Sequence, residues 1–170
     1  MYSPFLRAAA LALLLACAPR YHLPAVVPDK AVRESRELHP YFVSGEARRG
    51  VARNARTSWQ VQYDFSLAQE GGACRLREPH VTLEIQQWYP VANPQDVFAG
   101  DLNALERHEE GHLRIDRAAA HSLAEALRRT SPRETCDAVR EEARRAAALA
   151  IQECKASNAA YDAATNHGTR

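Results

Sequence analysis

The sequence has no excess of charge of either sign. Its 22 basic residues stand against 21 acidic ones, which gives a formal net charge of +1 over 170 residues, and the charges are spread along the chain. Nucleic acids and acidic membrane surfaces attract concentrated basic patches, so neither is expected as the main partner. The chain is also too short for two full domains, and it predicts one domain with a modest core.

The sequence also lacks an apolar run long enough to cross a bilayer, which takes about 20 residues. The run at residues 8–16 is a short stretch of alanines and leucines that follows Arg7. A basic residue before such a run is typical of a secretory signal peptide. The run ends in Leu14-Leu15-Ala16-Cys17, which resembles the lipobox of bacterial lipoproteins, in which the cysteine is acylated and becomes the N-terminus.

We therefore predict a signal peptide with a lipobox at residues 1–17 and a lipid on Cys17. Ala18 provides no acidic signal for retention at the inner membrane, which favours an outer-membrane lipoprotein in the periplasm. Ordinary cleavage after Ala18 is the alternative, because Ala16-Cys17-Ala18 also fits the small-x-small pattern, and it would give a soluble periplasmic or secreted protein. Both interpretations predict export, with the lipid as the only membrane attachment.

Cysteine is scarce, with three residues left after Cys17. Disulfides persist in the oxidising compartments to which exported proteins go. If residues 134–160 form one helix, Cys136 and Cys154 lie about 27 Å apart and cannot pair. Any disulfide must then use Cys74, and one thiol is left over.

Hydrophobic periodicity predicts strands followed by helices. Residues 18–39 contain three prolines and no sustained period, so we predict a tether there and a domain at 40–170. Residues 57–65 and 80–88 alternate as half-buried strands do. From about residue 101 the period becomes helical until Pro132, and a second helix is predicted at 134–160. The expected fold is α+β, with a small, mainly antiparallel sheet packed on two helices.

The first of these helices carries the motif His108-Glu109-Glu110-Gly111-His112, an HExxH pattern. Residues four apart lie on one helix face, so both imidazoles can bind one ion, and zinc is the metal that this pattern predicts. Glu109 is then the predicted general base. Chance spacing is the alternative, but Glu109 and His112 share the stripe of leucines that faces the core, where an unpaired charge is costly.

A third ligand is needed, and helix geometry removes two candidates. His121 lies on the opposite side of the helix from His112, and Asp116 lies about 12 Å along the axis from His108. Asp116 remains a candidate for orienting His112 from outside the ligand set, or for pairing with an arginine. The open candidates for the third ligand are His167, Cys154 and His80.

The segment Tyr161-Asp162-Ala163-Ala164-Thr165-Asn166-His167-Gly168, together with the HExxH motif, resembles a bacterial family known as domain of unknown function 922, over roughly residues 40–170. Its members are described as predicted secreted zinc-dependent proteases. The resemblance implies a zincin-like fold, His167 as the third zinc ligand, Tyr161 as a donor to the oxyanion and Asp162 as a residue that fixes a ligand imidazole. The order Trp88-Tyr89-Pro90 departs from the family's Pro-Trp feature.

These observations predict a zinc metallopeptidase that acts on a peptide or protein substrate in the cell envelope, held by strand addition at an edge strand at 80–88. A non-catalytic zinc lipoprotein that binds an envelope partner is the alternative, and a side chain such as Cys154 in the fourth coordination position would favour it. An amidase of cell-wall peptides would use the same metal chemistry.

Overall fold

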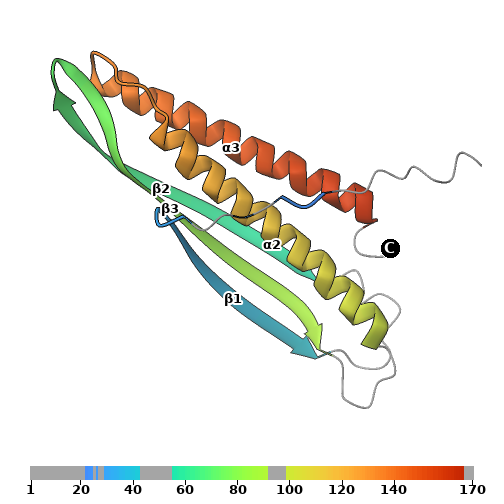
Figure 1. The fold of residues 1–170 in the computed structure, drawn as a ribbon. Coiled ribbons are helices and arrows are strands. Elements are labelled where there is room, and N and C mark those ends of the chain that lie inside the picture. The colour runs from blue at the N-terminus through green and yellow to red at the C-terminus, as the bar shows by residue number, and fades with distance from the viewer. Residues whose placement is uncertain (1–21, 25, 27–28, 43–54, 92–98, 167–170) are drawn as a thin grey trace, which may run out of the picture.

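In the computed structural model of the protein, residues 22–24, 26, 29–42, 55–91 and 99–166 are described. Their elements follow the order β1 (Val32–Phe42), β2 (Arg56–Glu70), β3 (Ala73–Val91), α2 (Ala99–Arg128) and α3 (Cys136–Thr165). The fold is α+β, a three-stranded mixed sheet followed by two packed helices (Figure 1). No helix among these residues is both long and apolar enough to cross a membrane. The predicted signal peptide at 1–17, with Cys17, lies outside the described residues.

The sheet has the strand order β1-β3-β2, with one parallel and one antiparallel pairing. β2 and β3 form a long hairpin whose turn is made by Gly71 and Gly72, both with positive φ, a conformation that glycine adopts without strain. The pairing of β2 with β3 is antiparallel, as predicted for most of the sheet, but β1 pairs in parallel with β3, so the sheet is mixed. The prediction that residues 80–88 form an edge strand is wrong, because this part of β3 lies between β1 and β2 and pairs with both.

Residues 32–39, predicted as part of the tether, form most of β1. All but two of the residues at 32–40 are exposed, so this strand carries no alternation of apolar and polar residues. The described residues before it also contact the domain. Leu23 packs against a cluster that includes Ile115 and Cys154, and Arg114 Nη2 donates to the carbonyl of Pro24 over 3.3 Å. The part of the tether that the structure describes is therefore attached to the domain.

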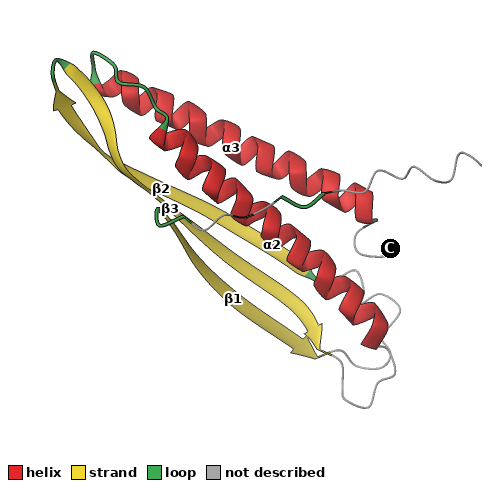
Figure 2. Ribbon diagram, viewed as in Figure 1, coloured by secondary structure: helices red, strands yellow, loops and turns green. Residues whose placement is uncertain are grey.

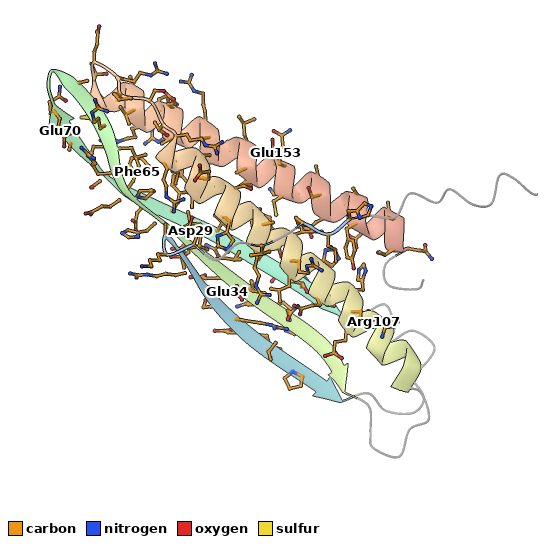
Figure 3. The ribbon with its side chains drawn as sticks, viewed as in Figure 1. Asp29, Glu34, Phe65, Glu70, Arg107 and Glu153 are labelled. Atoms are coloured by element: carbon orange, nitrogen blue, oxygen red, sulfur yellow. A yellow bond between two sulfur atoms is a disulfide. The ribbon has the colours of Figure 1, made fainter. Side chains whose placement is uncertain are left out.

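Both helices lie on one face of the sheet and run antiparallel to each other, with α2 against β3 and α3 against α2 (Figure 2). Their predicted existence is confirmed. α2 begins two residues before the predicted start and ends at Arg128, before the predicted break at Pro132, and α3 extends beyond the predicted end at residue 160. Thr135 caps α3, since its hydroxyl accepts from the N–H of Ala138, and Asn166 ends the helix in the left-handed conformation. Figure 3 shows Phe65 on the hairpin and Glu153 on α3, away from the sheet.

The core lies between the sheet and the helix pair. Its buried members come from one face of β3 and from the facing stripes of the helices: Val81, Leu83, Ile85, Leu113, Ala120, Leu123, Ala124, Leu127, Ala143, Ala147 and Ala150. The contribution of α3 is made of alanines, which let the two helix backbones approach closely. This packing fixes which residues of α3 face the HExxH motif.

A disulfide joins Cys74, next to the hairpin turn, to Cys136, the first residue of α3. The backbone of Arg133 pairs with that of Cys74 through hydrogen bonds of 2.7 and 3.1 Å. The prediction that any disulfide uses Cys74 is confirmed, and Cys154 is the buried free thiol. Such a bridge is typical of extracytoplasmic proteins.

Candidate metal centre

Three side chains from the two helices converge on one point. The Nε2 atoms of His108 and His112 lie 3.1 Å apart. Asp162 Oδ1 lies 3.2 Å from His108 Nε2 and 2.9 Å from His112 Nε2. His108 is buried at 6% exposure, whereas the side chain of Asp162 keeps 31%. The group can hold a metal ion that is accessible from the side of Asp162.

The second ring nitrogen of His112 bonds to Asn158 on α3. His112 Nδ1 lies 2.6 Å from Asn158 Oδ1, and Asn158 Nδ2 donates to Asp116 Oδ1 over 2.8 Å. Because the carboxylate of Asp116 takes the amide hydrogen, the amide oxygen must face His112, and His112 Nδ1 must carry a proton to donate. The Nε2 atom of a neutral His112 therefore presents its lone pair to the converging group.

His108 is oriented in a similar way by Thr165. The hydroxyl of Thr165 donates to the carbonyl of Tyr161 over 2.8 Å, so its oxygen is left to accept from His108 Nδ1 at 3.0 Å. Again the neutral imidazole directs the Nε2 lone pair inward. Hydrogen bonds at the outer nitrogen are the usual means by which proteins fix the tautomer of a metal-binding histidine.

This donor set fits a metal ion. Ligands about 2.0 to 2.1 Å from a tetrahedral zinc lie about 3.3 Å from each other, close to the three separations found here. Two nitrogen lone pairs and a carboxylate oxygen directed at one point repel each other unless a positive charge lies among them. A proton on one nitrogen would relieve only the contacts of that nitrogen, whereas a metal ion relieves all three.

Tyr161 packs against the two histidines from behind. Its ring stacks on His108 with centroids 5.0 Å apart and meets His112 edge-on at 5.1 Å. A Cβ at position 111 would lie 2.1 Å from the phenol oxygen of Tyr161, so the close approach of this ring requires Gly111. The close contact with Tyr161 therefore accounts for a glycine in the middle of this helix.

Glu109 is buried at 8% exposure and accepts a hydrogen bond of 2.5 Å from the hydroxyl of Thr57 on β2. The pKa of Glu109 is raised, mainly by burial and also by the nearby Asp162, although the bond from Thr57 and the neighbouring His112 act in the opposite direction. A buried carboxylate beside a metal group has the position and the low-dielectric surroundings that a general base needs.

Comparison with known proteins gives the family of the chain. The model of a bacterial protein family of unknown function, DUF922, matches residues 33–168. The chain belongs to the DUF922 family. No curated protein and no solved structure matches it. The matched segment begins in β1 and contains all of the converging group.

The DUF922 chain brings together only part of the predicted site. His108, Glu109 and His112 lie close together on α2, and Asp162, predicted to fix an imidazole, belongs with the two histidines to the group that could hold a metal ion. His167, predicted as the third ligand, lies outside the described residues. His80 is opposite Asp64 in the hairpin and is not part of the group, nor is His121.

Asp116 and Cys154 lie next to the centre without joining it. Cys154 Sγ donates to Asp116 Oδ1 over 3.5 Å, and burial raises the pKa of the Cys154 thiol, which opposes the thiolate that zinc binds. Asp116, predicted to orient His112, reaches it through Asn158. Burial raises the pKa of Asp116 to about 6.

Sequence reasoning missed three residues that contact the motif, Asn158, Thr165 and Thr57, because only the packing of α3 and β2 on α2 brings them there.

Proposed function

We propose that this DUF922 chain is a zinc-dependent metallopeptidase of the bacterial cell envelope, with His108, His112 and Asp162 as zinc ligands and Glu109 as general base. The observation that carries the proposal is the convergence of two oriented imidazole lone pairs and a carboxylate oxygen beside a second, buried carboxylate. An HExxH helix with this arrangement of charge suits hydrolysis by an activated water.

Zinc at this point would supply Lewis acidity, which makes water a nucleophile near neutral pH and polarises a carbonyl. The chain's own residues do the rest. Glu109 takes the proton of the attacking water and passes it to the leaving amine. Tyr161, through its packing on both imidazoles, keeps their rings in place. Its predicted role as an oxyanion donor stays a prediction, since its phenol oxygen lies against Gly111.

The proposed location is the periplasm, with the lipid on Cys17 as the membrane anchor. The disulfide between Cys74 and Cys136 supports an oxidising compartment. The proposed substrate is a peptide or protein of the envelope, and an amide bond of a cell-wall peptide would be cleaved by the same chemistry.

The number of protein ligands separates this proposal from a non-catalytic zinc lipoprotein. Among the described residues the group has three members, which leaves one position of a tetrahedral site for water. Cys154, named above as a side chain that would close the site if it bound the metal, bonds to Asp116 instead. The open position favours the peptidase over the binding module.

Metal content tests the ligand set. Zinc would be measured by mass spectrometry after dialysis of the chain without its signal peptide. We expect one zinc per chain in the wild type and in His121→Ala, a matched control on the other side of α2. Asp162→Asn should lower the affinity for zinc by at least about 100-fold, because the substitution removes a charged ligand and keeps the shape of the side chain. Unchanged zinc in this variant would refute Asp162 as a ligand.

His167→Ala tests whether the site is open. Retained zinc in this variant, with loss in Asp162→Asn, supports three protein ligands and the peptidase. Loss of zinc in both variants would indicate a closed site with four protein ligands and would favour the non-catalytic binding module.

Glu109→Gln tests the general base. This variant should keep zinc and lose cleavage of a library of internally quenched peptides, and cleavage retained in Glu109→Gln would sink the proposed mechanism.

A further inference from the structure

The buried carboxylate of Glu109 is the end of a hydrogen-bond chain that crosses all three strands. Arg36 Nε on β1 donates to Gln87 Oε1 on β3 over 2.7 Å, and Gln87 Nε2 donates to Thr57 Oγ1 on β2 over 3.1 Å. Thr57 Oγ1 then donates to Glu109 Oε2 on α2 over 2.5 Å. The chain connects a surface arginine to the proposed base through the buried side of the sheet.

The direction of every bond in this chain follows from Arg36. A guanidinium has donors only, so the amide oxygen of Gln87 must face it, and the NH₂ group must face Thr57. Thr57 accepts that hydrogen and has one proton left, which goes to Glu109. The chain therefore delivers a donor to the carboxylate, and a carboxylate that accepts is the form that a general base needs.

Gln87 occupies a position where the sheet pattern calls for an apolar residue. Val81, Leu83 and Ile85 precede it on the same face of β3 and are buried, and Gln87 is 4% exposed. A buried amide is costly unless its oxygen and nitrogen are both bonded, and here Arg36 and Thr57 supply those bonds. Thr57 lies directly opposite Gln87 in the register of the hairpin. A simple core position would be filled at lower cost by valine or leucine.

Arg36 is held at its end of the chain by a second contact. Its guanidinium lies 3.8 Å from the carboxylate of Glu110, the residue next to Glu109 on α2. The arginine thus spans from the sheet to the helix that carries the base.

We propose that Arg36, Gln87 and Thr57 are positioning residues that hold the Glu109 carboxylate in one orientation and act as a single unit. Their effect on catalysis rests on the proposed peptidase function, whereas the holding of Glu109 does not. The base is then aimed from the sheet, independently of the side chains of α3 that orient the zinc ligands.

Thermal unfolding of the full chain without its signal peptide tests the unit without any substrate. Thr57→Val keeps the shape and removes the donor, and it should lower the Tm by about 5 °C, since a buried carboxylate loses a charge-assisted bond. Arg36→Met should lower it less. Arg36 and Thr57 lie on strands that β3 separates, and Gln87 bonds to both. Additive shifts would therefore overturn the unit, and a double variant no less stable than Thr57→Val alone supports it. The control pair is Ser66→Ala on β2 and Arg33→Met on β1. These residues lie outside the hydrogen-bond chain and are opposite different residues of β3, Arg77 and Thr82, so their shifts should add.

Cleavage of the quenched-peptide library tests the positioning role. Thr57→Val should lower kcat by about 10- to 100-fold with KM and zinc content unchanged, because a small misplacement of a base costs that much, and Thr57→Ser should restore most of the rate. Unchanged kcat in Thr57→Val, or a loss that Thr57→Ser does not rescue, would overturn the role. If the wild type cleaves nothing while the unfolding shifts stay non-additive, the peptidase proposal fails and the holding of Glu109 stands.

Discussion

Replacing Gly111 by alanine should destabilise the protein, although alanine is the better helix former. The exchange gains about 1 kcal/mol of helix propensity. The new Cβ would lie 2.1 Å from the phenol oxygen of Tyr161 and 2.2 Å from the ring carbon that carries it. Ordinary contacts need about 3.5 Å, so the ring must move by roughly 1.5 Å. Tyr161 is 6% exposed and stacked on His108, so it cannot move away freely.

The size of the effect follows from these opposing terms. Overpacking of a buried site costs about 1 to 3 kcal/mol, and loss of the stacking on His108 costs about 1 kcal/mol more. After subtraction of the helix gain, the free energy of unfolding should fall by about 2 kcal/mol, or about 6 °C in Tm. Displacement of the ring also frees His108, so zinc affinity should fall in the same variant.

Urea and thermal unfolding of metal-free protein would measure the change, in the wild type and in a Tyr161→Ala background. With the ring removed, the clash disappears and only helix propensity remains, so Gly111→Ala should then stabilise by about 1 kcal/mol. This reversal of sign is specific to the contact between the two residues. Stabilisation by Gly111→Ala in the wild-type background would refute the packing of Tyr161 against the helix.

Two further predictions concern the support of the site. Because burial raises the folded-state pKa of Asp116 from 3.8 to about 6, the folded state keeps a proton that the unfolded state loses, and stability should fall as pH rises from about 4 to about 6, then level off. The free energy of unfolding of Asp116→Asn, relative to that of the wild type, should therefore rise by about 3 kcal/mol between pH 4 and pH 7 in chelator-treated protein. A difference between the two proteins that does not vary with pH would contradict this. The disulfide closes a separation of 62 residues, so Cys74→Ala with Cys136→Ala should cost up to about 4 kcal/mol by loop entropy. The urea midpoint would be measured with and without a reductant, with Cys154→Ala as the control for the free thiol. A midpoint that reduction leaves unchanged would contradict a stabilising disulfide.

The two helices and the HExxH motif could be predicted because their signals are local. Apolar residues recur with the helical period along α2, and two histidines four apart share a face whatever lies around them. The alternation at 57–65 and 80–88 likewise predicted parts of β2 and β3, whereas their pairing in one long hairpin was not predicted. Each of these elements is specified within one stretch of chain.

β1 gave no such signal, for a physical reason. The strand lies at the edge of the sheet and most of its residues are exposed, so neither face needs apolar side chains. What holds it are contacts with distant residues, such as the bidentate bond from Arg117 to Glu34 and the bond from Arg36 to Gln87. Its parallel pairing follows from these partners and from no pattern of its own.

The position of Asp162 depends on how far α3 is shifted along α2. A symmetrical hairpin about Pro132 would place residues 152–156 level with the first histidines, whereas the observed partners of His108 are Asp162 and Thr165. The connection does not turn tightly, because Arg133 pairs with the backbone of Cys74 and Cys136 is bonded to the same residue. The chain between the helices thus extends toward the hairpin before α3 begins. A sequence gives the periods of two helices but not this offset.

Two different parts of the fold therefore support the two halves of the proposed chemistry. The zinc ligands are oriented by α3, through Asn158 and Thr165, while Glu109 is oriented by the sheet, through Thr57 and Gln87. A change in the α3 contacts should weaken metal binding with the base still in place, and a change in the sheet contacts should weaken proton transfer with the metal still bound. α2 carries both histidines and Glu109, whereas Asp162 comes from α3, so the helix fixes the position of the base relative to the two histidines and the packing of α3 on α2 fixes the position of the third ligand.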